Sequence, residues 1–404
     1  MTIRIRLPGE DELEAFWRTI GLAFSDEATA AELELARKTD DPERHLAAYE
    51  GRTMVGTTSS YEFRLSVAGG EAPCAGVTAV AVMPTHRRRG ILTRLMRKQL
   101  AEVHEREEPL AALWASEGGI YGRFGYGLAT KNARIDAERD RAALGGADGA
   151  QVRLVDTDGA LAGMPRVYDR VRSVTPGFPS RSRTWWEHHV LSDLQEHRRG
   201  AGPLNRAVLE LDGRPEAYAL YRVKDEWPEG FPASTLVVQE EISASPAATR
   251  EIWRFLFGVD LVARVRNRAM PPDHPLFLLV PEPARLRFRL GDGIFLRLVD
   301  IRAALEARSY GEGSVTLEVT DSFCPWNEGR WALNGGGGGA SVRRGRRSPD
   351  LSLDVRALAS AYLGGFSFGE LVRAGCVEEH RKGAAVRADA LFRTDRAPWC
   401  PGFF

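Results

Sequence analysis

The sequence is poor in cysteine, lacks long apolar runs and has no excess of charge of either sign. Its four cysteines are far apart and form no C-x-x-C pair, which argues against a disulfide framework and a structural zinc site. No stretch approaches the ~20 consecutive apolar residues of a membrane helix. The first eight residues alternate apolar and basic side chains, as a short strand does, and contain no apolar segment like that of a secretory signal. We therefore expect a cytoplasmic protein that does not bind membranes.

Balanced charge also limits the partners that we expect. The 55 acidic side chains equal the 55 basic ones in number, so the chain as a whole has no net attraction for nucleic acid. The eight histidines show neither an H-E-x-x-H pattern nor another regular metal spacing, so no bound metal is expected. Any site for an anion must be local.

The first ~135 residues alternate between strand and helix patterns. Two segments have helical apolar spacing, at 13–24 and 91–104, and the strand candidates are 3–7, 53–59, 61–67, 76–82 and 110–115. A strand, a helix and a second buried strand in succession predict an α/β arrangement with a parallel pair.

Two further regions follow, since 404 residues are too many for one ordinary domain. Small residues at 142–150 indicate a linker. The central region has strand patterns near 151–155, 206–211, 215–223 and 234–241, a helix near 246–257 and a short apolar run at 276–280. The last region has strands at 294–299, 314–320 and 350–353 and helices at 300–307, 355–363 and 367–373. We expect domains at 1–145, 146–288 and 289–404.

A glycine run at 335–339 and the arginine-rich 343–347 lie between two apolar segments of the last region. A basic patch for an acidic partner is one interpretation. We favour a hairpin tip, because glycines without interleaved aromatic residues make a poor recognition surface.

The most informative segment is an apolar strand that ends at Pro84, followed by a basic turn and a helix from Ile91. Such a turn leaves several backbone N–H groups unpaired at the positive end of the helix dipole, where a diphosphate binds well. Gly90 allows the backbone to approach the phosphates closely. The strand 80–82 can bind an extended pantetheine arm through its backbone, as another strand would.

This segment resembles the acyl-CoA-binding motif of the GCN5-related N-acetyltransferases, Arg/Gln-x-x-Gly-x-Gly/Ala. Here the motif begins at Arg87, has its first glycine at Gly90 and ends in Leu92 instead of a small residue. The stretch 308–313 matches the six-residue pattern fully, yet it follows a helix and precedes a strand. We interpret it as a helix end and turn in which Gly311 and Gly313 adopt positive φ.

A second informative stretch is 116–127, which is rich in glycine and contains two tyrosines. In the superfamily, a tyrosine after the corresponding strand protonates the departing thiolate. Tyr126, between Gly125 and Gly127, is the favoured candidate. For Tyr121 a functional role and a packing role remain open.

Together these stretches resemble the Eis (enhanced intracellular survival) N-acetyltransferases of actinobacteria. The resemblance rests on 80–90, on 116–127, on 301–310 and on the aromatic end Phe403-Phe404. It implies two acetyltransferase-like folds, of which only the first binds CoA, followed by a sterol-carrier-like domain. It also implies a homo-hexamer that acetylates several amines of polyamine substrates such as aminoglycosides. The implied catalytic pair is Tyr126 and the terminal carboxylate of Phe404.

The expected ligands follow from these motifs and from the resemblance. No metal is among them, and the residues expected to contact acetyl-CoA are Val80, Ala81, Val82, Arg87, Arg88, Arg89, Gly90, Ile91, Ser116 and Tyr121. The resemblance further implies that Phe24 and Asp26 line the amine pocket. The alternative places Phe24 in the core and Asp26 at the cap of a helix at 27–36. The family's additional acidic residue near the C-terminus has no counterpart, because residue 401 is Pro.

Two other functions remain as alternatives at this point. The same chemistry could acetylate protein lysines, or the last domain could bind a lipid or another ligand.

Overall fold

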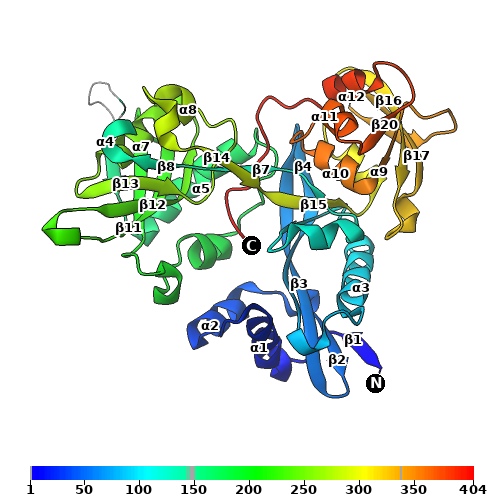
Figure 1. Cartoon of the computed structure of the whole chain (residues 1–404), viewed down its shortest axis with the longest axis horizontal. Coiled ribbons are helices and arrows are strands. Elements are labelled where there is room, and N and C mark those ends of the chain that lie inside the picture. Colours follow the sequence, from blue (N-terminus) through cyan, green and yellow to red (C-terminus); the bar gives the residue numbers. More distant parts are fainter. Residues whose placement is uncertain (1, 143, 145–150, 337–338) are drawn as a thin grey trace. The chain divides into compact units, whose positions relative to one another are not determined.

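The structure is a computed structural model that describes residues 2–142, 144, 151–336 and 339–404 (Figure 1). The chain forms two compact units. Unit 1 contains the chain up to Thr130, residues 294–395 and Phe403–Phe404, and unit 2 contains Lys131–Gly293 and Arg396–Gly402. Most of the predicted linker at 142–150 lies outside the described residues, as do residues 337–338 of the glycine run.

Unit 1 is built around a seven-stranded sheet of order β1-β2-β3-β4-β5-β15-β6. The strands are β1 (Ile3–Arg6), β2 (Leu46–Glu50), β3 (Thr53–Val67), β4 (Gly70–Val82), β5 (Leu110–Trp114), β6 (Gly127–Leu128) and β15 (Ile294–Leu298). Among the described strands of this sheet, only β4 and β5 pair in parallel, and helix α3 (Ile91–Glu105) connects them. This confirms the predicted strand-helix-strand arrangement. The two strands predicted at 53–59 and 61–67 are one continuous strand, because β4 pairs with β3 on both sides of Ser60.

Helices cover both faces of this sheet. Successive strand residues point to opposite faces, so neighbours in the sequence belong to different core clusters. Ile91 and Leu95 of α3 pack with Leu46 and Val55 on one face. On the other face, α1 (Leu13–Phe24) packs Phe16 against a cluster that contains Ala47, Tyr49 and Met54. Helix α2 (Ala30–Thr39) follows α1 (Figure 1).

Two irregularities in β4 shape the edge that it presents to β5. Ala79 has φ 54°, and the register against β3 shifts between Thr57 and Ser59, which is a β-bulge. Pairing between β4 and β5 ends at Gly76 and Ala112. From Val77 onward the β5-facing edge of β4 therefore has no partner among the strands that the structure describes.

Unit 1 also holds a five-stranded sheet of order β18-β17-β16-β19-β20. Its elements are β16 (Gly313–Thr320), β17 (Gly329–Gly335), β18 (Ser341–Arg344), β19 (Leu351–Asp354), β20 (Val377–Glu379), α9 (Ile301–Glu306), α10 (Val355–Tyr362), α11 (Phe368–Arg373) and α12 (Ala384–Phe392). Strands β17 and β18 pair antiparallel on either side of the glycine run, which confirms the predicted hairpin.

Unit 2 contains a six-stranded sheet of order β8-β13-β12-β11-β10-β9. Its strands are β8 (Asp136–Glu138), β9 (Gln151–Leu154), β10 (Asn205–Leu211), β11 (Arg214–Lys224), β12 (Ser234–Ser243) and β13 (Val262–Asn267), and a separate pair joins β7 (Lys131–Arg134) to β14 (Arg289–Asp292). Strands β12 and β13 are parallel and are connected by α7 (Pro246–Gly258), which repeats the β4-α3-β5 arrangement. Helices α5 (Thr157–Arg172) and α7 pack on opposite faces. The apolar run predicted at 276–280 forms the short helix α8 (Leu276–Leu279).

Strand pairing crosses both expected domain boundaries, at 145 and at 288. Strand β15, which we expected in the last domain, pairs with β5 and β6, and β8, which we expected in the first domain, pairs with β13. The reason is that an edge strand finds its partner through tertiary packing, which an apolar pattern does not encode. The three-domain division itself remains a prediction.

Candidate functional site

The turn between β4 and α3 has the backbone geometry of an anion site. It contains the short helix η3 (Pro84–His86), then Arg88 at φ 63° and Gly90 at φ 76°, which is the N-cap of α3. The N–H groups of Arg88, Arg89 and Gly90 have no hydrogen-bond partner in the described part of the chain. A Cβ built on Gly90 would meet no atom within 4 Å, so the space in front of this turn is open. These amides and the helix dipole together favour a negatively charged group.

The three arginines of the turn have different surroundings. The Arg87 Nη2 donates to the carbonyl of Ala23 at 3.1 Å, at the end of α1. The Arg89 Nη2 lies 2.5 Å from a carboxylate oxygen of Glu50, whose pKa is lowered to about 2 by Arg89 and His86. Arg88 is exposed and makes no ion pair or hydrogen bond with any residue that the structure describes. Its guanidinium is therefore available to a ligand, whereas those of Arg87 and Arg89 hold the turn in place.

The open edge of β4 presents unpaired backbone groups beside this turn. The Met83 N–H donates to the Val55 carbonyl of β3 at 3.0 Å. Because alternate residues of a strand direct their N–H and C=O groups to opposite sides, those of Val82 face the side from which β5 has diverged. The backbone of Ala81 faces β3 instead. Ile91, the first residue of α3, buries its side chain in the core and can offer only its backbone N–H to the turn.

The two candidate tyrosines belong to one apolar cluster, which also contains Val77 of β4 and Leu113 of β5. Their rings are 5.9 Å apart in an edge-to-face contact. The Tyr126 side chain is 1% exposed, and its hydroxyl has no partner among the described residues. Burial raises the pKa of Tyr126 well above its usual value. Tyr121 lies in the short helix η4 (Gly118–Phe124) and is 9% exposed; burial, together with Glu117, raises its pKa to about 12.

Arg297 of β15 is a neighbour of Tyr126 that no pattern in the sequence singles out. Its guanidinium is fully buried and its Nη2 lies 2.5 Å from a carboxylate oxygen of Asp321. A Cβ on Gly125, which has φ 84°, would lie 2.3 Å from the Arg297 Nη1. Glycine is therefore required at position 125 for two reasons: the turn needs a positive φ, and the Arg297 guanidinium occupies the space that a side chain would need. Glu50 and Gly76 were likewise missed, because strand-end carboxylates and strand glycines carry no distinctive sequence signal.

The end of the chain lies where β4 and β5 diverge. The ring of Phe404 packs against that of Phe63 at 5.2 Å, and a Cβ built on Gly76 would lie 3.3 Å from Phe404. Phe403 contacts Trp114, the last residue of β5, with ring centres 4.3 Å apart. Phe403 is nevertheless 51% exposed, so the chain end is seated on the sheet without being fully buried.

Phe24 and Asp26 follow the end of α1 and are both exposed. The core interpretation of Phe24 is wrong, since its side chain is 53% exposed. The helix-cap interpretation of Asp26 is also wrong: within the described part of the chain its carboxylate accepts only the N–H of Glu27, and Thr29 caps α2. The bond from Arg87 to Ala23 places this segment next to the turn. Ser116 is exposed two residues after β5.

The second match to the six-residue motif is a structural element, as its context predicted. Arg308 follows α9, is 3% exposed and donates its guanidinium to the carbonyls of Tyr362 and Phe392. Gly313 has φ 141°, but Gly311 is not in the left-handed region, so that part of the prediction is wrong. A Cβ on Gly311 would instead lie 2.7 Å from the carbonyl of Ala390, so close packing is what requires glycine there.

No cluster of three His, Cys, Asp or Glu side chains among the described residues could hold a metal ion. No described helix is both long enough and apolar enough to cross a membrane.

Comparison with known proteins gives consistent matches along the chain. Residues 4–129 and 177–298 each match an Acetyltransferase (GNAT) domain family, and residues 301–401 match the Sterol carrier protein domain family. An uncharacterized N-acetyltransferase of Streptomyces avermitilis is 41% identical over the whole of both chains. The N-acetyltransferase Eis of Mycobacterium tuberculosis is 33% identical over 98% of each chain. The crystal structure of Eis1 from Mycobacterium abscessus covers both chains fully with a TM-score of 0.85 at 34% identity.

The order of the matched families agrees with the two α/β sheets and the five-stranded sheet described above. The protein thus has two acetyltransferase folds and a sterol-carrier-like fold, and it is an N-acetyltransferase. At 33% identity over nearly the full length of both proteins, the chain belongs to the Eis family of GCN5-related N-acetyltransferases.

Proposed function

We propose that the protein transfers the acetyl group of acetyl-CoA to primary amines of small polycationic molecules, of which aminoglycosides are one class. Three features of unit 1 together support this proposal most. They are the open turn before α3, the unpaired edge of β4 and the position of Phe404 where β4 and β5 diverge. An exposed acid, Asp26, and an exposed aromatic ring, Phe24, lie beside the turn, and this pair suits a substrate ammonium.

The proposed binding of acetyl-CoA uses a subset of the residues expected from the sequence. The N–H groups of Arg88, Arg89 and Gly90 and the guanidinium of Arg88 bind the diphosphate. The backbone of Val80 and Val82 binds the pantetheine arm, and an N–H of this edge stabilises the oxyanion. Ser116 and Tyr121 complete the site after β5. Arg87 and Arg89 position the turn through Ala23 and Glu50.

The acetyl transfer needs a base and an acid. An ammonium has no lone pair, so a base must first remove a proton from the amine, and we assign this step to the carboxylate of Phe404. The amine then attacks the thioester carbon, the C–S bond breaks, and the thiolate takes a proton from a tyrosine, while the nitrogen gives up its second proton to solvent as the amide forms. The sequence favours Tyr126 for this acid. We propose Tyr121 instead, because the Tyr126 hydroxyl is enclosed beside Arg297 and Tyr121 is the more accessible of the two.

The test is the rate of thiol release from acetyl-CoA in the presence of aminoglycosides, linear polyamines and lysine peptides. We expect the highest kcat/KM for a molecule with several amines. Faster acetylation of lysine peptides than of any small polyamine would replace this proposal with protein acetylation. We also propose the homo-hexamer that the family resemblance implies, and sedimentation velocity of the purified chain checks it.

A further inference from the structure

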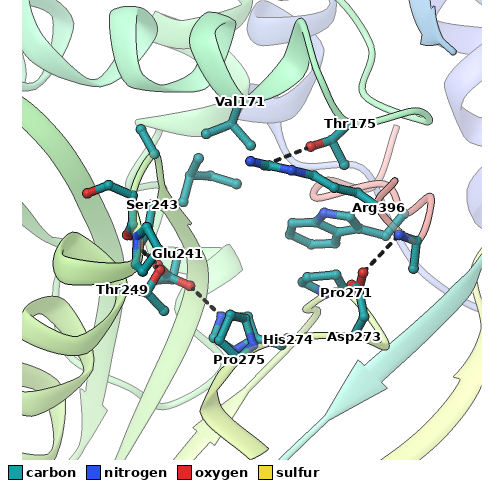
Figure 2. Close-up of a pocket in the computed structure, with 16 residues that line it drawn as sticks. Val171, Thr175, Glu241, Ser243, Thr249, Pro271, Asp273, His274, Pro275 and Arg396 are labelled. Atoms are coloured by element: carbon teal, nitrogen blue, oxygen red, sulfur yellow. Dashed lines mark hydrogen bonds and ion pairs between the residues drawn. The ribbon is translucent and has the colours of Figure 1, made fainter. Parts of the chain in front are cut away.

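A cavity of about 260 Å³ lies within unit 2, and all of its lining residues belong to that unit (Figure 2). It is bounded by the end of β12, the start of α7, the end of α5, the loop before α8 and the segment Arg396–Trp399. Its buried lining includes Val171, Glu241, His274 and Trp399, while Asp273 and Arg396 are exposed at its rim. Figure 2 shows Glu241 and Asp273 on opposite walls.

The position of this cavity corresponds to the phosphate-binding turn of unit 1, because each lies at the start of the helix that connects two parallel strands. In unit 2 the connection has only two residues, Ala244 and Ser245. Pro246 at the start of α7 has no N–H, and the Ser245 hydroxyl accepts the N–H of Ala248 at 3.3 Å. The helix end therefore offers few free amides. Two carboxylates line the same cavity, so it is unsuited to a phosphate.

Hydrogen bonds hold the side chains of the inner wall in place. The Leu276 N–H donates to His274 Nδ1 at 3.0 Å, so the imidazole is neutral and carries its proton on Nε2. This Nε2 lies 3.1 Å from Glu241 Oε2 and donates to it. The Trp253 Nε1 donates to the same oxygen at 3.2 Å, and the Ser243 hydroxyl donates to Oε1. Both oxygens of the Glu241 side chain therefore accept hydrogen bonds, from three donors that hold it in place.

The rim adds one charge of each sign. Asp273 Oδ2 accepts the N–H of Ala397 at 2.8 Å, which leaves Oδ1 to face a ligand. Arg396 Nη1 donates to the Thr175 hydroxyl at 3.3 Å. The lining thus holds two acidic side chains and one guanidinium. Both ring nitrogens of His274 are already engaged, so this imidazole is not arranged as a general base.

We propose that this cavity is a binding site for a small organic diamine, separate from the acetyl-transfer site. One ammonium contacts Glu241 and the other contacts Asp273, while the chain between them packs on Trp399 and Val171. A volume of about 260 Å³ accommodates a small diamine. The two acidic side chains on opposite walls favour a ligand with two positive charges over a ligand with one. The proposal rests on the geometry of unit 2 alone and does not depend on the proposed acetyl acceptor.

Binding can be measured at Trp399 without reference to activity. The full-length chain is labelled with 5-fluorotryptophan, the ¹⁹F resonance of residue 399 is assigned with Trp399→Phe, and pentane-1,5-diamine is titrated without acetyl-CoA. We expect a saturable shift of this resonance. The uncharged pentane-1,5-diol and the anionic pentanedioate should leave it unchanged.

Three variants separate this site from the amine pocket of unit 1. Asp26→Asn should leave the titration midpoint unchanged, whereas Asp273→Asn should raise it about tenfold or more, the cost of losing one charge-assisted contact. Asp273 is exposed, so its substitution should not prevent folding; Glu241→Gln tests the inner wall, with its folding checked by circular dichroism. An unchanged midpoint in Asp273→Asn, an equal response to the diol, or no shift at 10 mM diamine (about a thousandfold above a ~10 μM site) would overturn the proposal.

Discussion

The ring of Phe404, the last residue of the chain, packs edge-to-face against Phe63 of β3 with ring centres 5.2 Å apart. Phe63 lies beside Gly76, the last residue of β4 that pairs with β5. A Cβ built on Gly76 would lie 2.3 Å from the Phe63 ring. A chain end is usually frayed and solvated. Here two aromatic contacts, Phe404 on Phe63 and Phe403 on Trp114, bring it to the divergence of β4 and β5.

The terminal carboxylate is tested by moving it without removing the aromatic contacts. A short polar tag after Phe404 displaces the carboxylate, whereas deletion of Phe404 removes both the ring and the original carboxylate. We expect both forms to lose kcat by about 10²-fold or more, the usual contribution of a general base. A tagged protein with full activity would leave Phe404 only an anchoring role.

The two tyrosines form a matched pair. Tyr121→Phe should lower kcat by about 10²-fold with little change in the affinity for acetyl-CoA, because a general acid acts only as the thiolate leaves. Tyr126→Phe should have a much smaller effect on kcat, since it removes a buried hydroxyl that has no partner among the described residues. The reverse ranking in steady-state kinetics would return the acid role to Tyr126, as the sequence favoured.

Arg88 is expected to contact the diphosphate directly. Arg88→Ala should raise the KM for acetyl-CoA about tenfold or more through loss of a charge-assisted contact, with an unchanged melting temperature because this side chain is exposed. Arg343→Ala, another exposed arginine in unit 1, is the control and should leave the KM unchanged. Comparable KM values for Arg88→Ala and the control would mean that the turn does not bind the diphosphate through this residue.

A buried pair near α2 should give a pH-dependent stability. Asp40 lies 3.8 Å from His45, whose ring stacks on Phe16. Burial raises the pKa of Asp40 to about 6 and lowers the pKa of His45 to about 4. Between pH 4 and 6, Asp40 binds more protons in the folded state than in the unfolded state. Its contribution to the free energy of unfolding therefore falls as the pH rises. Between pH 4 and 6.5, His45 binds more protons in the unfolded state than in the folded state, so its contribution rises with pH and opposes that of Asp40.

Substitution separates the two contributions. Relative to the parent protein, Asp40→Asn should gain stability as the pH rises from 4 to 7. The gain is at most about 3 kcal/mol, because the pKa of Asp40 in the folded state is about two pH units above its ordinary value. His45→Gln should lose relative stability over the same range. Melting temperatures of the three proteins at pH 4.5 and 7.5 measure this, and differences that do not vary with pH would contradict it.

The structural features that depend on residues close together in the chain could be predicted from the sequence. The apolar strand before Pro84, the turn residue Gly90 and the helical spacing from Ile91 predict β4, the turn and α3, because each depends on neighbours within a few residues. The same holds for the hairpin around the glycine run and for the prediction that Arg308 belongs to a helix end, which followed from the order of helix and strand.

The sequence alone thus predicted the elements around the turn and the family, but not several other elements, among them β2 and α5. Tertiary structure decided which strand completes each sheet, as β15 shows, and which of three adjacent arginines is free to bind a ligand. It also left Tyr121 slightly more exposed than Tyr126 and brought Phe404 to Phe63. The physical reason is the same in each case: burial and pairing depend on residues that are far apart in the chain, and a local pattern carries no information about them.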